Sequence, residues 1–142
     1  MHAVFSTKER RPLLDDKSIR EEMHLYLSGI LATLDCQLIV VGGTKDHVHL
    51  LFVLSSTRNV AEIIKEVKQG SSLWVKTRSP ELAGFAWQSG CGVFSLGFSQ
   101  IESVRKYISG QEAHHRKVSF QDEFKKLLKR YEVEFDERTV WD

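Results

Sequence analysis

The chain has 142 residues, of which 42% are hydrophobic and 27% charged, with 20 basic and 19 acidic side chains. This length and composition predict one compact domain spanning residues 1–142 and exclude a fibrous or largely disordered protein. The apolar runs are too short to cross a bilayer and the first residues have a strand pattern, so we expect no membrane span, no signal peptide and a cytoplasmic location.

The charge is distributed unevenly along the chain. Residues 132–142 contain five acidic side chains and one arginine, which leaves residues 1–131 with 19 basic and 14 acidic groups, a net charge of +5. The sequence therefore predicts a mildly basic body followed by an acidic tail at about 132–142. This balance by itself does not identify a nucleic-acid-binding protein.

The first half of the chain contains three predicted strands and a helix. A strand is expected at residues 2–6 and a helix at 14–34. Two more strands are expected at 36–41 and 47–54, and the glycine-containing segment 42–46 between them predicts a hairpin.

The second half alternates helices with one short strand. A helix is predicted from Val60 to about Arg78, with Asn59 and Glu62 as its cap pair. A short strand follows at 93–96, then a helix that contains Tyr107, and a last helix at 120–131. The order β-α-β-β-α-β fits an α+β ferredoxin-like sandwich, in which a central antiparallel sheet packs against helices.

The segment Asp46-His47-Val48-His49 contains two imidazoles in an otherwise apolar run. Alternate residues of a strand share one face and lie about 7 Å apart, so both rings can converge on one ion or one phosphate. The alternative is a pair of histidines that are only hydrogen-bonded at the end of a strand.

The helix around Tyr107 contains the best partners for these histidines. Ser99 and Glu102 have the spacing of a capping box, and an apolar stripe repeats at helical spacing behind them. Tyr107 and Gln111 are then neighbours at i and i+4, at the edge of the buried surface. The alternatives are a partly buried tyrosine and a solvated glutamine. For His114-His115, we favour a role at the helix C-terminus over metal ligation.

Two basic segments are candidates for DNA binding. Three lysines and Ser72 lie on one face of the predicted 60–78 helix, and Lys8-Glu9-Arg10-Arg11 forms a basic loop. Such a stripe can follow phosphates, although an ordinary solvated helix face has the same pattern. The candidate residues are Lys8, Arg10, Arg11, Lys65, Lys68 and Lys76.

Short motifs of one known family occur in order along nearly the whole chain. They are Val4-Phe5-Ser6-Thr7-Lys8, Arg10-Arg11-Pro12, Gly42-Gly43, Asp46-His47-Val48-His49, Lys68, Ser71-Ser72, Trp87-Gln88, Gly92-Val93-Phe94-Ser95, Tyr107-Ile108, Gln111, His114-His115, Ser119-Phe120, Glu123-Phe124, Phe135-Asp136-Glu137-Arg138 and Trp141-Asp142. With them the chain resembles the single-tyrosine HUH transposases of small bacterial insertion sequences, including those associated with repetitive extragenic palindromes. It departs from the family at Cys91 and at residues 96–98, and neither departure carries the chemistry.

The resemblance implies a fold and a set of residue roles. The fold is the ferredoxin-like sandwich with C-terminal helices that carry the catalytic tyrosine; the strand containing the two histidines is central, and its opposite face is free for a second subunit or DNA. Tyr107 matches the nucleophile. His47, His49 and Gln111 match the ligands of a divalent metal, Mg²⁺ or Mn²⁺.

The resemblance also implies the reaction and the partners. The substrate is single-stranded DNA with hairpin ends, which is cleaved and rejoined through a 5′-phosphotyrosine intermediate. The protein is expected to act as a homodimer with composite sites in trans, because Gly97 and Gly110 suggest that the helix carrying Tyr107 is loosely tethered to its own core.

Three alternatives use some of the same residues. A histidine-triad nucleotide hydrolase needs a third histidine two residues after His49, where this chain has Leu51. A domesticated hairpin-binding protein of the same fold would not need Tyr107 together with both histidines. A relaxase or replication-initiator nickase uses the same chemistry, but the transposase resemblance extends from end to end of this short chain.

Overall fold

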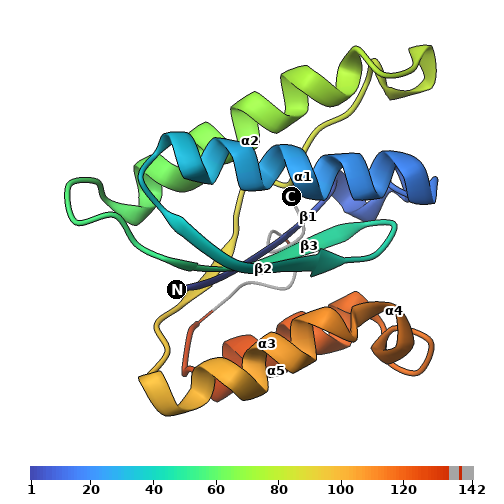
Figure 1. The fold of residues 1–142 in the computed structure, drawn as a ribbon. Helices are drawn as coiled ribbons and strands as arrows, with labels where there is room; N and C mark the ends of the chain where they lie inside the picture. The colour runs from blue at the N-terminus through green and yellow to red at the C-terminus, as the bar shows by residue number, and fades with distance from the viewer. Residues whose placement is uncertain (135–137, 139–142) are drawn as a thin grey trace.

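The computed structural model describes residues 1–134 and 138 (Figure 1). Most of the acidic tail that we predicted lies outside these residues. The described strands and α-helices are β1 His2–Ser6, α1 Lys17–Thr33, β2 Gln37–Gly43, β3 His47–Val53, α2 Val60–Lys76, β4 Gly92–Phe94, α3 Ile101–Ser109, α4 Gln111–His114 and α5 Phe120–Arg130.

The four strands form one antiparallel sheet in the order β2-β3-β1-β4. β2 and β3 make the predicted hairpin, with an irregularity in the register between Leu38 and Val40. β3 is an interior strand, as expected, and its residues His47 to Phe52 are buried because helices pack on both faces of the sheet. The α+β class and the ferredoxin-like sandwich are confirmed.

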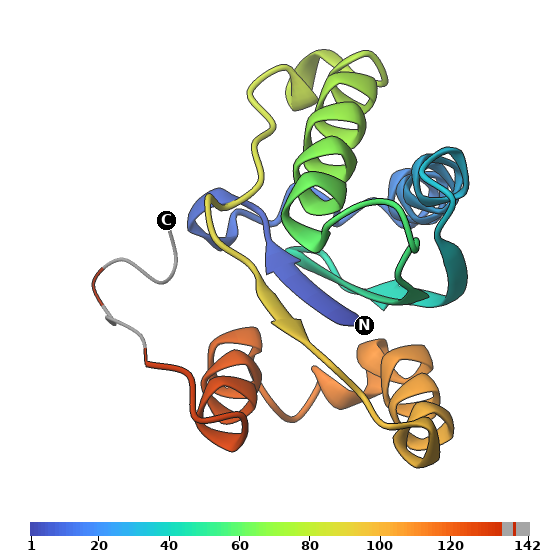
Figure 2. The same cartoon turned by 90° about the vertical axis from the view of Figure 1, so that its left-hand side faces the viewer.

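Helices cover both faces of the sheet, which corrects one expectation. α1 and α2 lie on one face, whereas α3 and α5 lie on the other (Figures 1 and 2). The main core lies under α1 and α2, and a smaller cluster joins Val4 and Phe94 to Phe120, Phe124 and Leu128 of α5. The face that was expected to be free for DNA or a second subunit is therefore occupied by the chain's own C-terminal helices.

Local sequence signals fix where most helices begin. Asn59 Oδ1 accepts a hydrogen bond from the amide of Glu62, as predicted, and Ser119 Oγ accepts one from the amide of Asp122 at the start of α5. α3 begins at Ile101 without a side-chain cap, so the predicted Ser99–Glu102 capping box is wrong.

The single helix predicted around Tyr107 is divided into α3 and α4. The division falls at Gly110, whose φ of −94° and ψ of 16° depart from helical values. Glycine has a low helix propensity, which makes this position the easiest one at which to interrupt the helix.

None of the helices in the described part of the chain is long and apolar enough to span a membrane.

Candidate metal and tyrosine site

The structure brings together the four residues that the sequence singled out for chemistry. His47 and His49 of β3 are fully buried, with ring centroids 5.2 Å apart. His47 Nε2 lies 3.0 Å from Gln111 Oε1, and the ring centroid of His49 lies 5.8 Å from that of Tyr107. The two histidines come from β3, Tyr107 from α3 and Gln111 from the start of α4.

Both imidazoles are held from their Nδ1 sides. His47 Nδ1 donates to Asp46 Oδ1 at 2.8 Å and lies 3.1 Å from Thr44 Oγ1. His49 Nδ1 and His2 Nε2 share a hydrogen bond of 2.8 Å, and these two rings stack with centroids 5.1 Å apart. Such outer contacts fix the orientation of a ring, and here they leave both Nε2 atoms directed into the site.

His2 was not predicted as part of the site. It lies at the start of β1, and in the antiparallel register Val4, on the same face of β1, is opposite His49. Only the pairing of β1 with β3 brings His2 near His49, and no local pattern in the sequence predicts that register.

Glu123 of α5 lies at the centre of the group. Its carboxylate accepts hydrogen bonds from the Tyr107 hydroxyl, from His49 Nε2 at 2.8 Å and from Gln111 Nε2 at 3.2 Å. The Nε2 atoms of His114 and His115 each lie 3.1 Å from Glu123 Oε2. A carboxylate that is only 3% exposed is costly to bury, and the hydrogen bonds from Tyr107, His49 and Gln111 offset that cost.

Glu123 belongs to a family motif but was not predicted as a site residue. The available signal was its position on the apolar stripe of α5, where it lies between Phe120 and Phe124 at helical spacing. An acidic residue on an apolar helix face is rarely buried without a partner, so this position indicated a buried polar site.

The site favours neutral forms of His2 and His49, an ionised Glu123 and a protonated Tyr107. Burial lowers the pKa of His49 to about 4 and that of His2 to about 3. Burial opposes ionisation of Glu123, but its contacts with His115 and His49 hold its pKa well below the usual value. Burial and the hydrogen bond to Glu123 raise the pKa of the Tyr107 hydroxyl above its ordinary value.

The donor atoms of this group fit a divalent metal ion. The imidazole nitrogens of His47, His49 and His115 and a carboxylate oxygen of Glu123 all lie within 4.8 Å of one another. Ligands bound to one ion at about 2.1 Å are about 3 to 4 Å apart, so small shifts would suffice. His115 Nε2 is buried and makes no hydrogen bond within the described residues, which leaves its lone pair available.

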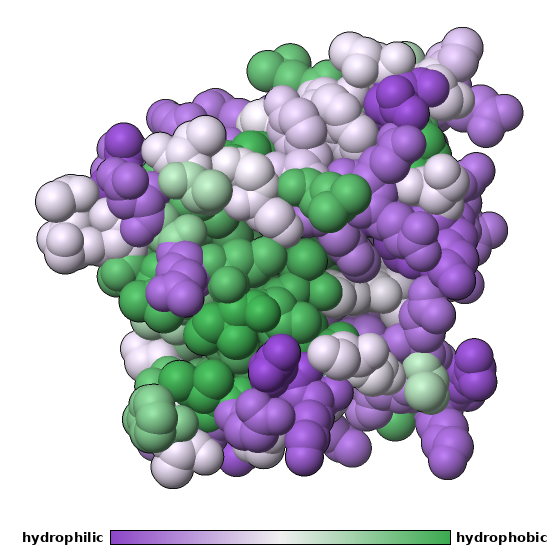
Figure 3. Space-filling view, viewed as in Figure 1, coloured by the Kyte–Doolittle hydropathy of each residue, from purple (hydrophilic) through white to green (hydrophobic). Residues whose placement is uncertain are grey.

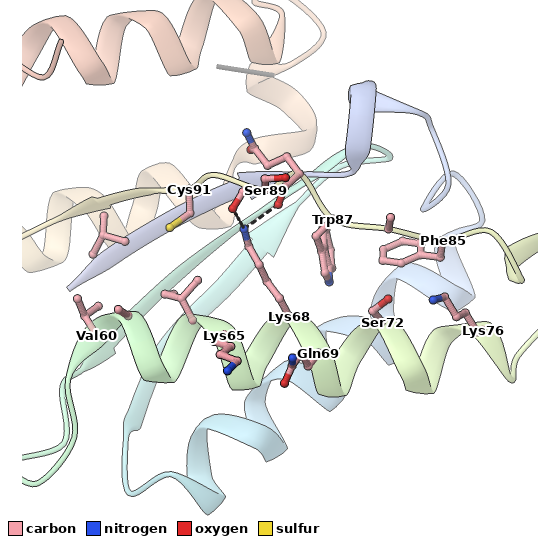
Figure 4. A pocket seen from close by; sticks show the side chains of 15 residues that line it. Val60, Lys65, Lys68, Gln69, Ser72, Lys76, Phe85, Trp87, Ser89 and Cys91 are labelled. Atoms are coloured by element: carbon pink, nitrogen blue, oxygen red, sulfur yellow. Dashed lines mark hydrogen bonds between the residues drawn. The ribbon is translucent and has the colours of Figure 1, made fainter. Parts of the chain in front are cut away.

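The predicted lysines of α2 line a separate cavity of about 640 Å³ between α2 and the segment Phe85–Cys91 (Figure 4). Lys65 and Lys76 are exposed at this cavity. The ammonium group of Lys68 instead donates to the carbonyl oxygens of Gln88 at 2.8 Å and Gly90 at 2.7 Å, and its burial lowers its pKa. Lys68 therefore holds the 88–90 loop against α2.

The second basic segment forms the turn after β1. Lys8 and Arg11 are exposed in the turn that follows β1. When the side-chain amide of Gln121 is turned so that its oxygen faces Arg10, that oxygen accepts hydrogen bonds from both terminal nitrogens of the guanidinium group. This contact connects the turn to α5. The amide of Lys8 donates to the carbonyl oxygen of Ala86 at 2.8 Å, so this turn lies beside the segment that lines the α2 cavity.

Comparisons with known proteins identify the family of this chain. Residues 1–111 match the family model described as "Transposase IS200 like". No curated protein matched the chain. Two solved structures share its fold. One is a predicted transposase from Deinococcus radiodurans R1, with a TM-score of 0.60, 21% identity, and coverage of 78% of this chain and 88% of that one.

The other is a REP-associated tyrosine transposase bound to a REP hairpin, with a TM-score of 0.60, 13% identity, and coverage of 82% of this chain and 68% of that one. At these identities, the similarity to the two structures shows a shared fold and nothing more. The family match covers most of the sequence, from the first residue through both histidines and Tyr107 to Gln111. The chain therefore belongs to the IS200-like transposases, a family of DNA-processing enzymes.

Proposed function

We propose that this transposase cleaves and rejoins single-stranded DNA at hairpin-bearing element ends through a covalent 5′-phosphotyrosine on Tyr107. The observation that carries the proposal is the hydrogen bond from the Tyr107 hydroxyl to Glu123, inside a site that also contains His47 and His49. A phenol next to a buried carboxylate and two imidazoles suits nucleophilic attack on a phosphodiester.

The reaction conserves a phosphodiester bond at each step. In cleavage, the phenolic oxygen of Tyr107 forms a bond to phosphorus while the bond to the 3′-oxygen breaks, which leaves a free 3′-hydroxyl. Glu123 is in position to receive the phenolic proton because it already accepts that hydrogen bond. In rejoining, a 3′-hydroxyl attacks the phosphotyrosine and releases Tyr107.

His47, His49 and Gln111 are the residues that we propose to hold a divalent metal, Mg²⁺ or Mn²⁺. When bound, such an ion supplies positive charge that stabilises the reacting phosphate. Asp46 and His2 fix the two rings so that their Nε2 atoms stay directed inward. Gln111 Oε1 is already 3.0 Å from His47 Nε2 and needs little movement to join them.

The DNA partner is proposed from charge and from the fold. Lys65 and Lys76 are exposed beside the α2 cavity, and Lys8 and Arg11 are exposed in the turn after β1. A relative of the same fold is bound to a REP hairpin. We propose that these cations contact the phosphates of the hairpin or its flanking strand, and that Lys68 and Arg10 support them by ordering the two segments.

We also propose that the protein forms a homodimer. An apolar surface lies over β2, the edge strand, whose residues Leu38 to Val41 are only partly buried (Figure 3). An apolar sheet edge is a favourable surface for pairing with a second chain. Each chain already contains a complete group of site residues, so composite sites in trans would require α3 to exchange between subunits.

A strand-cleavage assay tests the proposal. Labelled single-stranded oligonucleotides that carry candidate hairpin ends are incubated with the protein and Mn²⁺, and duplexes of the same sequence serve as the matched control. We expect cleavage of the single strands only. Cleavage of duplexes alone would contradict the proposal, and tight hairpin binding without cleavage would favour the non-catalytic alternative.

A further inference from the structure

Half of the metal-binding group lies beyond the part of the chain that the family model matches. The match ends at residue 111, whereas His115 and Glu123 follow it in α4–α5. His47 and His49 lie within the matched region. The site thus combines residues from the matched region with residues from the C-terminal segment.

Helix α5 packs closely against β3, the strand that contains His47 and His49. The ring of Phe120 stacks on that of His47 with centroids 4.4 Å apart and an interplanar angle of 21°. Phe120 and Phe124 are both buried in the smaller core cluster, and Ser119 caps the helix. Glu123, between the two phenylalanines, is consequently directed at His49 by a rigid helix and not by a loop.

A carboxylate oxygen of Glu123 and the Nε2 atom of His115 lie close to the Nε2 atoms of His47 and His49. Glu123 Oε1 lies 2.8 Å from His49 Nε2 and 3.7 Å from His47 Nε2. The ring centroid of His115 lies 4.4 Å from that of His47, and its Nε2 lies 3.1 Å from Glu123 Oε2 without a hydrogen bond. An imidazole nitrogen and a carboxylate oxygen at this distance can both bind one cation.

We infer that His115 and Glu123 are metal ligands in addition to His47, His49 and Gln111, so that three imidazoles and one carboxylate bind the ion beside the amide oxygen. This inference rests on the proposed function, because it concerns the metal of the same reaction. Gln111 keeps the ligand role proposed above, and its amide also contacts His47 at 3.0 Å and Glu123 at 3.2 Å, so it holds these two side chains in place.

This donor set has a consequence for metal choice. Mg²⁺ prefers oxygen ligands and retains several water molecules, whereas imidazole nitrogens suit transition ions such as Co²⁺, Zn²⁺ and Mn²⁺. A site with three imidazoles should therefore bind Mn²⁺ and Co²⁺ more tightly than Mg²⁺.

Cobalt titration tests the inference without DNA. Binding of Co²⁺ to the full-length protein is followed by its visible absorption in the wild type, Glu123→Gln and His115→Ala. We expect each variant to bind at least about tenfold more weakly, with an altered absorption band, because each loses a ligand. Asp122→Asn is the matched control, since Asp122 is an exposed acid next to Glu123 in α5 and is not in the ligand group, and it should bind Co²⁺ like the wild type.

A variant that misfolds would also lose metal binding, so a second measurement uses the wild-type protein. Pulsed electron paramagnetic resonance of the Mn²⁺-loaded wild type counts the imidazole nitrogens coupled to the ion. Three nitrogens are expected, and two would overturn the assignment of His115. Wild-type Co²⁺ affinity in Glu123→Gln would likewise overturn the assignment of Glu123.

The failure of this inference is distinguishable from the failure of the proposed function. If His47→Ala/His49→Ala loses Co²⁺ binding while Glu123→Gln and His115→Ala keep wild-type affinity, only the two extra ligands are wrong. If the double histidine variant also keeps wild-type affinity, the metal site of the proposed function is wrong as well. The tyrosine chemistry is tested independently of metal binding, by formation of the covalent DNA adduct on Tyr107.

Discussion

The main chain of Gly42 in β2 lies directly against that of Ile108 in α3. A Cβ built at Gly42 would come within 2.4 Å of the carbonyl oxygen of Ile108, and the Ile108 side chain is fully buried. The helix that carries Tyr107 is therefore packed closely on its own sheet. The expectation of a loosely tethered helix, which was based on Gly97 and Gly110, is wrong for this structure.

The first prediction concerns this contact. Gly42→Ala should displace α3 from β2, lower the free energy of unfolding by about 1–3 kcal/mol and weaken metal binding, because overpacking forces the backbone apart. Gly29→Ala is the control: a Cβ at this position of α1 meets nothing within 4 Å, so the change should be neutral or stabilising. Thermal unfolding measures both variants, and equal stability of Gly42→Ala and the wild type would refute the close-contact account.

The second prediction concerns His2. His2→Phe keeps an aromatic ring beside His49 but removes the hydrogen bond of 2.8 Å that orients it. Loss of such an outer contact should weaken metal affinity by about 10- to 100-fold. Calorimetry with Mn²⁺ measures the effect, and His2→Gln, whose amide can restore a hydrogen bond, should recover part of the affinity. An unchanged affinity in His2→Phe would show that His2 only fills space.

The third prediction concerns pH. In the folded protein the pKa of His49 is about 4 and that of His2 about 3, compared with 6.5 for the free side chain. The unfolded chain therefore binds more protons over this range, so the stability of the metal-free protein should fall as the pH drops from about 6.5 toward 4. Glu123 acts in the same direction below pH 4.5, because its folded pKa is held down.

Denaturant unfolding at several pH values, in the presence of a chelator, measures this slope. His2→Phe removes one of the two histidines and should flatten it. A wild-type stability that stays constant between pH 6.5 and 4.5 would contradict the assignment of neutral, buried histidines.

The fourth prediction concerns assembly. A dimer that mixes Tyr107→Phe with His47→Ala/His49→Ala has no complete site if each chain uses its own tyrosine, and one complete site if the tyrosines are exchanged. The packing of Ile108 on Gly42 predicts that this mixed dimer is inactive. Recovered cleavage in the co-expressed heterodimer would instead show that α3 is exchanged in trans, as the family resemblance implies.

The sequence predicted the features that depend on local periodicity. Alternation placed His47 and His49 on one face of an interior strand, and the glycine-containing turn predicted the β2–β3 hairpin. Asn59 was correctly identified as a cap because its side chain acts within one turn of the helix. These signals need no knowledge of tertiary packing.

The features that the sequence did not predict depend on long-range packing. Glu123 and His115 join the site because α5 folds back onto the sheet, and His2 joins it through the register of β1 with β3. The same docking covers the sheet face that we expected to be free. The contact between His115 and Glu123 likewise joins residues of α5 and the end of α4, and the helix-terminal position of His115 does not predict it.

The most direct test of the central claim is to map the covalent adduct. The wild-type protein is incubated with a single-stranded hairpin end and Mn²⁺, digested with protease and nuclease, and analysed by mass spectrometry. The account predicts a nucleotide attached to Tyr107 and no adduct in Tyr107→Phe, which should still bind the hairpin because it lacks only the hydroxyl. An adduct on another residue, or strand cleavage by Tyr107→Phe, would contradict the assignment of Tyr107 as the nucleophile.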